Sequence, residues 1–347
     1  MRWPWQRKAS TDLTVVSWSG NAVAYVCAKA LDGGRFDIKR MGVERQGSDG
    51  SEDFVRRLQA LDLKGLDAQV MLRPEQYQVL QVEMPAVTPE ELRSAVRYQI
   101  REMVDLHIDD ITLDVMRVGD GQQKGTGNVF VVVAANAVIN EVQMFGKAMQ
   151  WPVSVIDVQE TAQRNLQTLL AQRDGAAEKA DAALIISGDR QAVLTISANG
   201  ELFYTRRLEL PDGFMELSWG DVQNAAAEAV DSYTPVTEYV PGYAAEQSSS
   251  VLSAAGGGES DPAQRILVEI QRSLDLWDRS WSGMPLAGLR VYAGERSVEL
   301  AQWLSREIGQ TVSAMDLNAF FPGLENAPPD VRDMCLPLLG VLMRTPN

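Results

Sequence analysis

The chain has 347 residues, of which 45% are hydrophobic and 23% are charged, and its formal net charge at pH 7 is −15. This length is enough for two domains, and the composition is ordinary for a soluble globular protein. Because contacts with phosphates need clustered Lys and Arg, the acidic balance argues against nucleic acid as the main partner.

Residues 1–11 form a basic and aromatic tail, in which Trp3 and Trp5 stand beside positive charges. The tail lacks the apolar core of a signal peptide, and we expect it to be disordered. A weak peripheral contact with an anionic membrane surface is the alternative, since Trp and positive charge together suit such a surface. No apolar run in the chain approaches the ~20 residues that a membrane span needs.

The first half, residues 12–170, is expected to open with three strands, a helix and a fourth strand. Hydrophobic periodicity places these elements at 12–18, 22–28, 36–41, 51–61 and 68–72. Ser19-Gly20-Asn21 and Gly33-Gly34 supply the turns between the strands.

An inserted small α+β subdomain is expected at about residues 84–135. The segment Thr88-Pro89-Glu90-Glu91 predicts a helix that begins with a capping box and a proline at its first position. Apolar residues at helical spacing predict one buried face: Leu92, Ala95, Val96, Ile100, Met103 and Val104. Strands are expected at 110–116 and 128–135, and the second is apolar on both faces, which is typical of a central strand.

The first half is expected to end with a helix at 137–150, a strand at 153–156 and a helix after Asp157. Glu160 lies three residues after Asp157, and this spacing predicts a second capping box. The polar residues 171–181 indicate a boundary between the two halves.

The second half, residues 181–343, repeats the opening order of elements. Strands are expected at 182–187, 191–197 and 201–208, and a helix at 221–231. Asn199-Gly200 is a strong signal for the second hairpin. A flexible loop is expected at about 241–260, before a long helix that starts at Pro262. The half ends with a strand at 289–293, a helix at 298–308 and a strand at 311–315.

Both halves therefore open with three strands and a helix, which is a duplication of topology without a duplication of sequence. This order suggests an α/β fold of the actin-like, ribonuclease H-like class, built from duplicated β-β-β-α-β halves with an inserted subdomain.

Four segments resemble the PilM family, the actin-like cytoplasmic proteins of type IV pilus assembly, and its variant MshI of the mannose-sensitive haemagglutinin (MSHA) pilus. They are Met84–Val118, with its Met-Pro and Glu-Glu-Leu-x-x-Ala-Val; 157–160; 199–207, ending in Thr-Arg-Arg; and 269–275, with Glu-Ile-x-Arg-Ser-Leu. The resemblance covers most of residues 12–340. It implies a cytoplasmic protein that is peripheral to the inner membrane of a Gram-negative bacterium.

In the actin-like fold, two hairpin loops hold the nucleotide phosphates and a third, Gly-rich loop holds the adenosine. The candidate cofactor-binding residues at these loops are Gly20, Gly188, Asp189 and Gly294. The family's ATP-binding members have a carboxylate in both phosphate loops, whereas this chain has Trp18 in the first and Ile186 in the second. We therefore expect no catalytic residues, no metal and no cofactor. In a shifted register Asp189 would supply a carboxylate, and ATP with Mg²⁺ is the alternative cofactor.

The resemblance implies a non-catalytic scaffold that docks the N-terminal cytoplasmic peptide of a PilN-like inner-membrane protein beside Met84–Val118. Arg93, Arg97 and Arg101 are the candidate partner-binding residues, and a solvated helix face paired with acidic neighbours is the alternative. A pilus motor ATPase is a second candidate partner. An ATP-hydrolysing switch of pilus or secretion assembly, a sugar kinase and a filament-forming cell-division protein share this fold, but each would use an intact nucleotide site.

Other catalytic and metal chemistry has little support in the sequence. Cys27 and Cys335 each lie in an apolar run, and buried free thiols in a reducing compartment are the favoured interpretation. His107 is the single histidine, and no CxxC or Cys/His cluster is present. We expect neither a zinc site of the usual kinds nor Ser-His-Asp catalysis.

Overall fold

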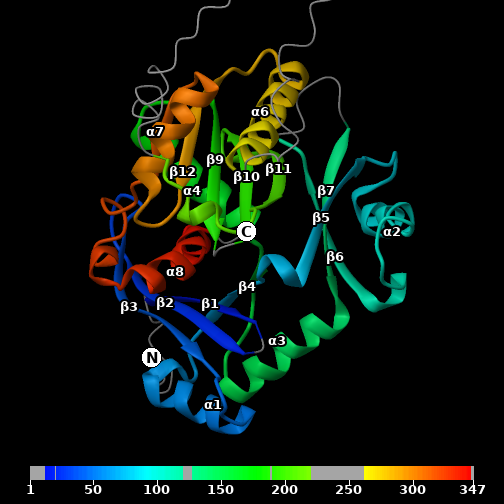
Figure 1. Ribbon diagram of the computed structural model, residues 1–347. Coiled ribbons are helices and arrows are strands. Elements are labelled where there is room, and N and C mark those ends of the chain that lie inside the picture. Colours follow the sequence, from blue (N-terminus) through cyan, green and yellow to red (C-terminus); the bar gives the residue numbers. More distant parts are fainter. Residues whose placement is uncertain (1–11, 20, 120–126, 188–189, 220–261, 345–347) are drawn as a thin grey trace, which may run out of the picture.

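Two five-stranded sheets and one three-stranded sheet organise the described part of the chain (Figure 1). The computed structural model describes residues 12–19, 21–119, 127–187, 190–219 and 262–344. The expected tail at 1–11, helix at 221–231 and loop at 241–260 lie outside the described residues. Within the described part of the chain, no helix combines the length and apolar character needed to cross a membrane.

The first five-stranded sheet has the order β3-β2-β1-β4-β8. Its strands are β1 (Asp12–Trp18), β2 (Ala22–Ala30), β3 (Phe36–Arg45), β4 (Ala68–Met71) and β8 (Ile156–Asp157). The first three strands are antiparallel, whereas β4 and β8 join in parallel. The helix α1 (Ser51–Leu58) buries Phe54 and Leu58 against this sheet, as its helical spacing predicts.

The second five-stranded sheet has the corresponding order, β11-β10-β9-β12-β13, so the duplication of topology is present. Its strands are β9 (Ala180–Ser187), β10 (Gln191–Ala198), β11 (Glu201–Glu209), β12 (Leu286–Tyr292) and β13 (Val312–Ala314). Asn199 and Gly200 both have positive φ, as the predicted hairpin turn requires.

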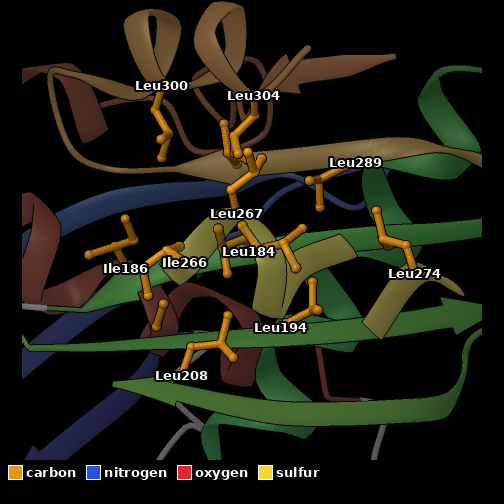
Figure 2. Packing of buried hydrophobic residues seen from close by; sticks show 14 of the residues in the cluster. Leu184, Ile186, Leu194, Leu208, Ile266, Leu267, Leu274, Leu289, Leu300 and Leu304 are labelled. Atoms are coloured by element: carbon orange, nitrogen blue, oxygen red, sulfur yellow. The ribbon is translucent and has the colours of Figure 1, made fainter. Parts of the chain in front are cut away.

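Helices α6 (Pro262–Ser280) and α7 (Ser297–Ile308) cover one face of the second sheet. Figure 2 shows side chains of both helices gathered with those of the strands, and Leu267, Leu300 and Leu304 belong to one buried cluster with Leu184 and Leu289. Burial of these apolar side chains stabilises the second half.

Helices α4 (Gln159–Arg173) and α8 (Pro329–Leu342) lie between the two five-stranded sheets (Figure 1). Helix α4 follows the first sheet in sequence but packs on β9 and β10, whereas α8 ends the chain and packs on β1, β2 and β3. The two helices approach so closely that a Cβ at residue 340 would lie 2.9 Å from the Cα of Ala162 and would overlap its carbonyl oxygen. A single hydrophobic core therefore runs from one sheet to the other.

The small sheet has the order β5-β7-β6, with β5 (Tyr77–Glu83), β6 (Ile111–Arg117) and β7 (Asn128–Ala135). Helix α2 (Pro89–Gln99) packs on one face of it, and α3 (Asn136–Met149) leads from β7 to the first sheet. The central position of β7 is confirmed. Strand β5 was not predicted, and it extends the small sheet to residues before 84.

Two local predictions about helix ends differ from the structure. The capping box of Thr88 and Glu91 forms, but α2 ends at Gln99, and Met103 is 49% exposed instead of lying on the buried face. The box predicted for Asp157 and Glu160 is absent: Val158 is the N-cap of α4, and no side chain caps it. Glu160 is instead fully buried, with partners far away in the sequence.

Short helical turns complete the described chain: η1 (Gln59–Leu63), η2 (Pro74–Gln76), η3 (Ile108–Asp110), η4 (Phe214–Glu216) and η6 (Leu324–Asn326). The two cysteines are buried free thiols, as expected, and burial raises the pKa of Cys335 to about 12.

Candidate functional site

Of the residues predicted at the nucleotide loops, Gly294 is described, whereas Gly20, Gly188 and Asp189 lie outside the described residues. Gly294 has φ +58° between β12 and α7, and its carbonyl oxygen accepts a 2.6 Å hydrogen bond from Ser297 Oγ. A Cβ here would lie 2.5 Å from the carboxylate of Asp333 on α8. The positive φ and the neighbouring Asp333 carboxylate therefore both favour glycine at this position, whether or not a nucleotide binds.

The carboxylate of Asp333 occupies the space beside this loop. The hydroxyl of Tyr292 donates a 2.6 Å hydrogen bond to it, and burial raises the pKa of both groups. At the first phosphate loop, the ring of Trp18 stacks on Phe145 of α3 with the centroids 4.6 Å apart. Both contacts are internal packing interactions.

The arginines predicted to bind a partner do not share one exposed face. Arg93 pairs with Asp114 of β6, with 2.6 Å between Nη2 and Oδ1. Arg97 donates to the carbonyl oxygens of Ile108 and Ile111, at 2.6 and 3.2 Å. Arg101 is exposed and follows the end of α2. The structure therefore brings Arg93 and Arg97 to strand β6 and leaves Arg101 away from it.

Strand β6 is an edge strand, and its backbone directions can be assigned from three hydrogen bonds. Val118 donates to the carbonyl oxygen of Asn128 at the β7 side. The carbonyl oxygen of Ile111 accepts from Arg97, and the N–H of Val115 donates to Asp114 Oδ1 at 2.9 Å. Because successive residues of a strand alternate, even-numbered residues of β6 bond to β7 and odd-numbered residues direct their N–H and C=O to the free edge.

Strand β8 is the edge strand of the first sheet and faces the same region. Val70 and Leu72 of the β4 segment donate to the carbonyl oxygens of Val155 and Asp157, at 3.0 and 2.9 Å. The backbone of the residue between them, Ile156, therefore points away from β4. The free edges of β6 and β8 thus form the two sides of a groove.

This groove has a volume of about 410 Å³ and lies between the small sheet, the first sheet and α4. Its lining comes from β6 and β7 on one side, and from β8, α4 and the end of α8 on the other: Asp114, Val115, Met116, Val132, Ile156, Asp157, Val158, Thr161, Arg164, Asn165, Met343 and Arg344. The lining combines aliphatic side chains with hydrogen-bonding groups of both kinds. Such a surface offers a ligand both apolar contacts and hydrogen bonds.

An ion pair between buried Asp157 and the more exposed Arg344 lies in the groove. Asp157 is 4% exposed, and its Oδ2 accepts a 3.0 Å hydrogen bond from Arg344, while its Oδ1 accepts from the N–H of Val158 and from the Thr161 hydroxyl. Asn165 anchors the far wall by donating to the carbonyl oxygen of Gly340 at 2.8 Å. The polar groups of the groove are therefore held in place before any ligand arrives.

A second buried network fixes the small sheet against the rest of the molecule. Arg207 of β11 donates to Glu160 Oε1 of α4 from Nε and Nη2, at 3.1 and 3.0 Å. Its Nη1 donates to the carbonyl oxygens of Pro74 and Tyr77, at 2.6 and 3.0 Å, and its guanidinium lies 4.3 Å from the Tyr77 ring centroid. The Tyr77 hydroxyl donates to Glu160, and burial next to this carboxylate raises its pKa well above the ordinary value.

Sequence reasoning missed the residues that shape the groove. Asp114, Asp157 and Arg344 were not predicted at a site, and neither was Arg207 of the second network. A local signal existed for Asp114, which alternates with apolar residues in a strand. Nothing near Asp157 in the sequence indicates Arg344, which is 187 residues away.

The repeated sheet order, the two helices between the sheets and the inserted small sheet define an actin-like α/β fold, as the sequence predicted. Among solved structures, a PilM-PilN type IV pilus biogenesis complex has a TM-score of 0.64 and 14% identity, covering 96% of this chain and 99% of that chain. Likeness at this level of identity shows the fold.

Two further structures are more distant. The cytoplasmic domain of EpsL, an inner-membrane component of the type II secretion system of Vibrio cholerae, has a TM-score of 0.42 and 13% identity over 65% of this chain and 84% of that one. A Bacteroides thetaiotaomicron protein with an actin-like ATPase fold has a TM-score of 0.48 and 8% identity over 95% and 96%. No protein-family model and no curated protein matches the sequence.

Proposed function

We propose that this protein is a non-catalytic scaffold of a type IV pilus assembly machine of the MSHA kind. In this proposal it works in the cytoplasm at the inner membrane and docks the N-terminal cytoplasmic peptide of a PilN-like protein. The observation that carries the proposal is the preformed groove between β6 and β8, in a fold similar to that of a PilM-PilN complex.

The groove fits a short extended segment for physical reasons. Aliphatic side chains such as Val132, Ile156 and Met343 line it beside fixed donors and acceptors, which is the mixture that a peptide backbone with apolar side chains needs. Cytoplasmic tails of inner-membrane proteins tend to carry Lys and Arg, and a net charge of −15 attracts such tails.

The first test is binding of a synthetic peptide that spans the N-terminal cytoplasmic segment of the PilN-like protein from the same genome. Fluorescence anisotropy should give saturable binding to the wild-type protein. Met343→Glu places a carboxylate in the groove and should weaken binding at least about tenfold. A bound peptide would have to remove water from the new charge, and this desolvation costs free energy.

A matched control is Arg272→Ala on α6, which removes an exposed ion pair with Glu269 far from the groove. We expect its affinity to equal that of the wild type. Absence of binding to the wild-type protein, or an equal loss in both variants, contradicts the proposal.

A further inference from the structure

We propose that the partner peptide binds as an added β-strand along the free edge of β6, and that the Arg93–Asp114 ion pair is a displaceable cover of this edge. The inference rests on the proposed function, because the peptide is the tail of the proposed inner-membrane partner. It adds the binding mode, the register and the contact that the peptide displaces.

The open part of the edge begins at Leu113. Arg97 covers the part of the edge that precedes Leu113, because its half-buried guanidinium donates hydrogen bonds to the carbonyl oxygens of Ile108 and Ile111. Beyond this block, Leu113, Val115 and Arg117 direct their N–H and C=O groups outward. An extended peptide can exchange hydrogen bonds with these residues at alternate positions, as in other cases of strand addition.

Asp114 occupies this edge in the free protein. Its Oδ1 accepts a hydrogen bond from the N–H of Val115 at 2.9 Å, where the carbonyl oxygen of an added strand would bond. Arg93 holds the carboxylate in place, but the two side chains are 68% and 71% exposed. An exposed ion pair contributes little stability, so a peptide can displace it at small cost. Such covers protect edge strands from unwanted pairing.

The groove also specifies the side chains of the peptide. Every second side chain of a strand paired with β6 would face Met116, Val132 and Ile156, whereas the others would lie on the face of the small sheet that α2 covers. The fitting ligand is therefore an extended segment with apolar residues at alternate positions. Because the ion pair of Asp157 and Arg344 is already satisfied, the side chains that enter the groove need no charge.

The cover and the edge can be tested separately by substitution. Arg93→Ala should raise the affinity for the labelled peptide about two- to fivefold, because the cover is weakened. Val115→Pro removes the outward N–H but no bond to β7, and it should weaken binding at least about tenfold. Val115→Ala truncates the side chain and keeps the N–H, so it should bind more tightly than Val115→Pro. Thermal melting verifies that each variant is folded.

N-methylation of the peptide tests the same inference on the wild-type protein, even if Val115→Pro does not fold. Methylating one backbone nitrogen at a time should weaken binding about tenfold at every second position within the bound segment. Uniform effects along the peptide, while the unmodified peptide binds, would overturn strand addition and leave the groove proposal standing. If the unmodified peptide does not bind, both proposals are wrong.

Discussion

The buried network of Glu160 and Arg207 allows a quantitative test of how the small sheet is held. Arg207→Met removes the guanidinium that bonds Glu160 and the carbonyl oxygens of Pro74 and Tyr77. Glu160 has no exposed surface, so its carboxylate would remain in the interior without its charged partner. Methionine fills a similar volume, and the loss is therefore electrostatic.

Removing one member of a buried ion pair costs about 3–5 kcal/mol of unfolding free energy. The Arg207 side chain is 29% exposed, which favours the lower end, about 3 kcal/mol. The double variant Glu160→Met with Arg207→Met removes both charges. It should be more stable than Arg207→Met by about 1–2 kcal/mol, because no unpaired charge remains inside.

Urea-induced unfolding at pH 7 and constant salt, followed by circular dichroism, measures these differences. Arg206→Met is the matched control, since Arg206 is the neighbouring residue and pairs with Glu269 in a partly exposed ion pair. Its loss should stay within about 1 kcal/mol. If Arg207→Met costs no more than this control, or if the double variant is the least stable, the reasoning is refuted.

Three further predictions concern the helix crossing, the pH dependence and the nucleotide. Gly340→Ala should lower the unfolding free energy by about 3 kcal/mol or more, because the methyl group overlaps Ala162; an unchanged melting temperature contradicts this. Burial raises the pKa of Asp181 to about 6, so the unfolded chain loses this proton at lower pH than the folded one. Stability should therefore fall by about 2 kcal/mol as pH rises from 4 to 6, and Asp181→Asn should remove this part of the slope. Millimolar Mg-ATP should leave the melting temperature unchanged, whereas a ligand at 100 times its dissociation constant adds about 2.7 kcal/mol; a clear shift would place Asp189 at the phosphates.

Local sequence signals determined most of the secondary structure. Three strands and a helix open the first half where alternation and turn residues predicted them, and the Asn199-Gly200 hairpin forms. The capping box of Thr88 and Glu91 is present because all of its atoms lie within one turn of helix. Strand β5 (Tyr77–Glu83) lies between prolines at 74 and 85, and it was missed because the adjacent apolar residues Val79 and Leu80 interrupt its alternation.

Predictions that depended on distant partners were wrong or absent. Glu160 has the spacing of a capping residue, but burial of α4 brings it to Arg207, 47 residues away, and a charged partner in the interior outweighs a local hydrogen bond. The sequence also showed no sign that Arg93 would pair with Asp114 or that Arg97 would bond the carbonyl oxygen of Ile111. The partner-binding role of these arginines stays a prediction.

The sequence by itself thus determined most of the elements, their order and the actin-like class, because periodicity, turns and caps act over a few residues. Tertiary structure alone decided that the edges of β6 and β8 lie on opposite sides of one groove, and that Arg344 is the charge that pairs with Asp157. The physical reason is that a buried charge is stabilised by whichever opposite charge the packing of sheets and helices brings within reach, and Arg344 arrives there only when α8 packs against α4.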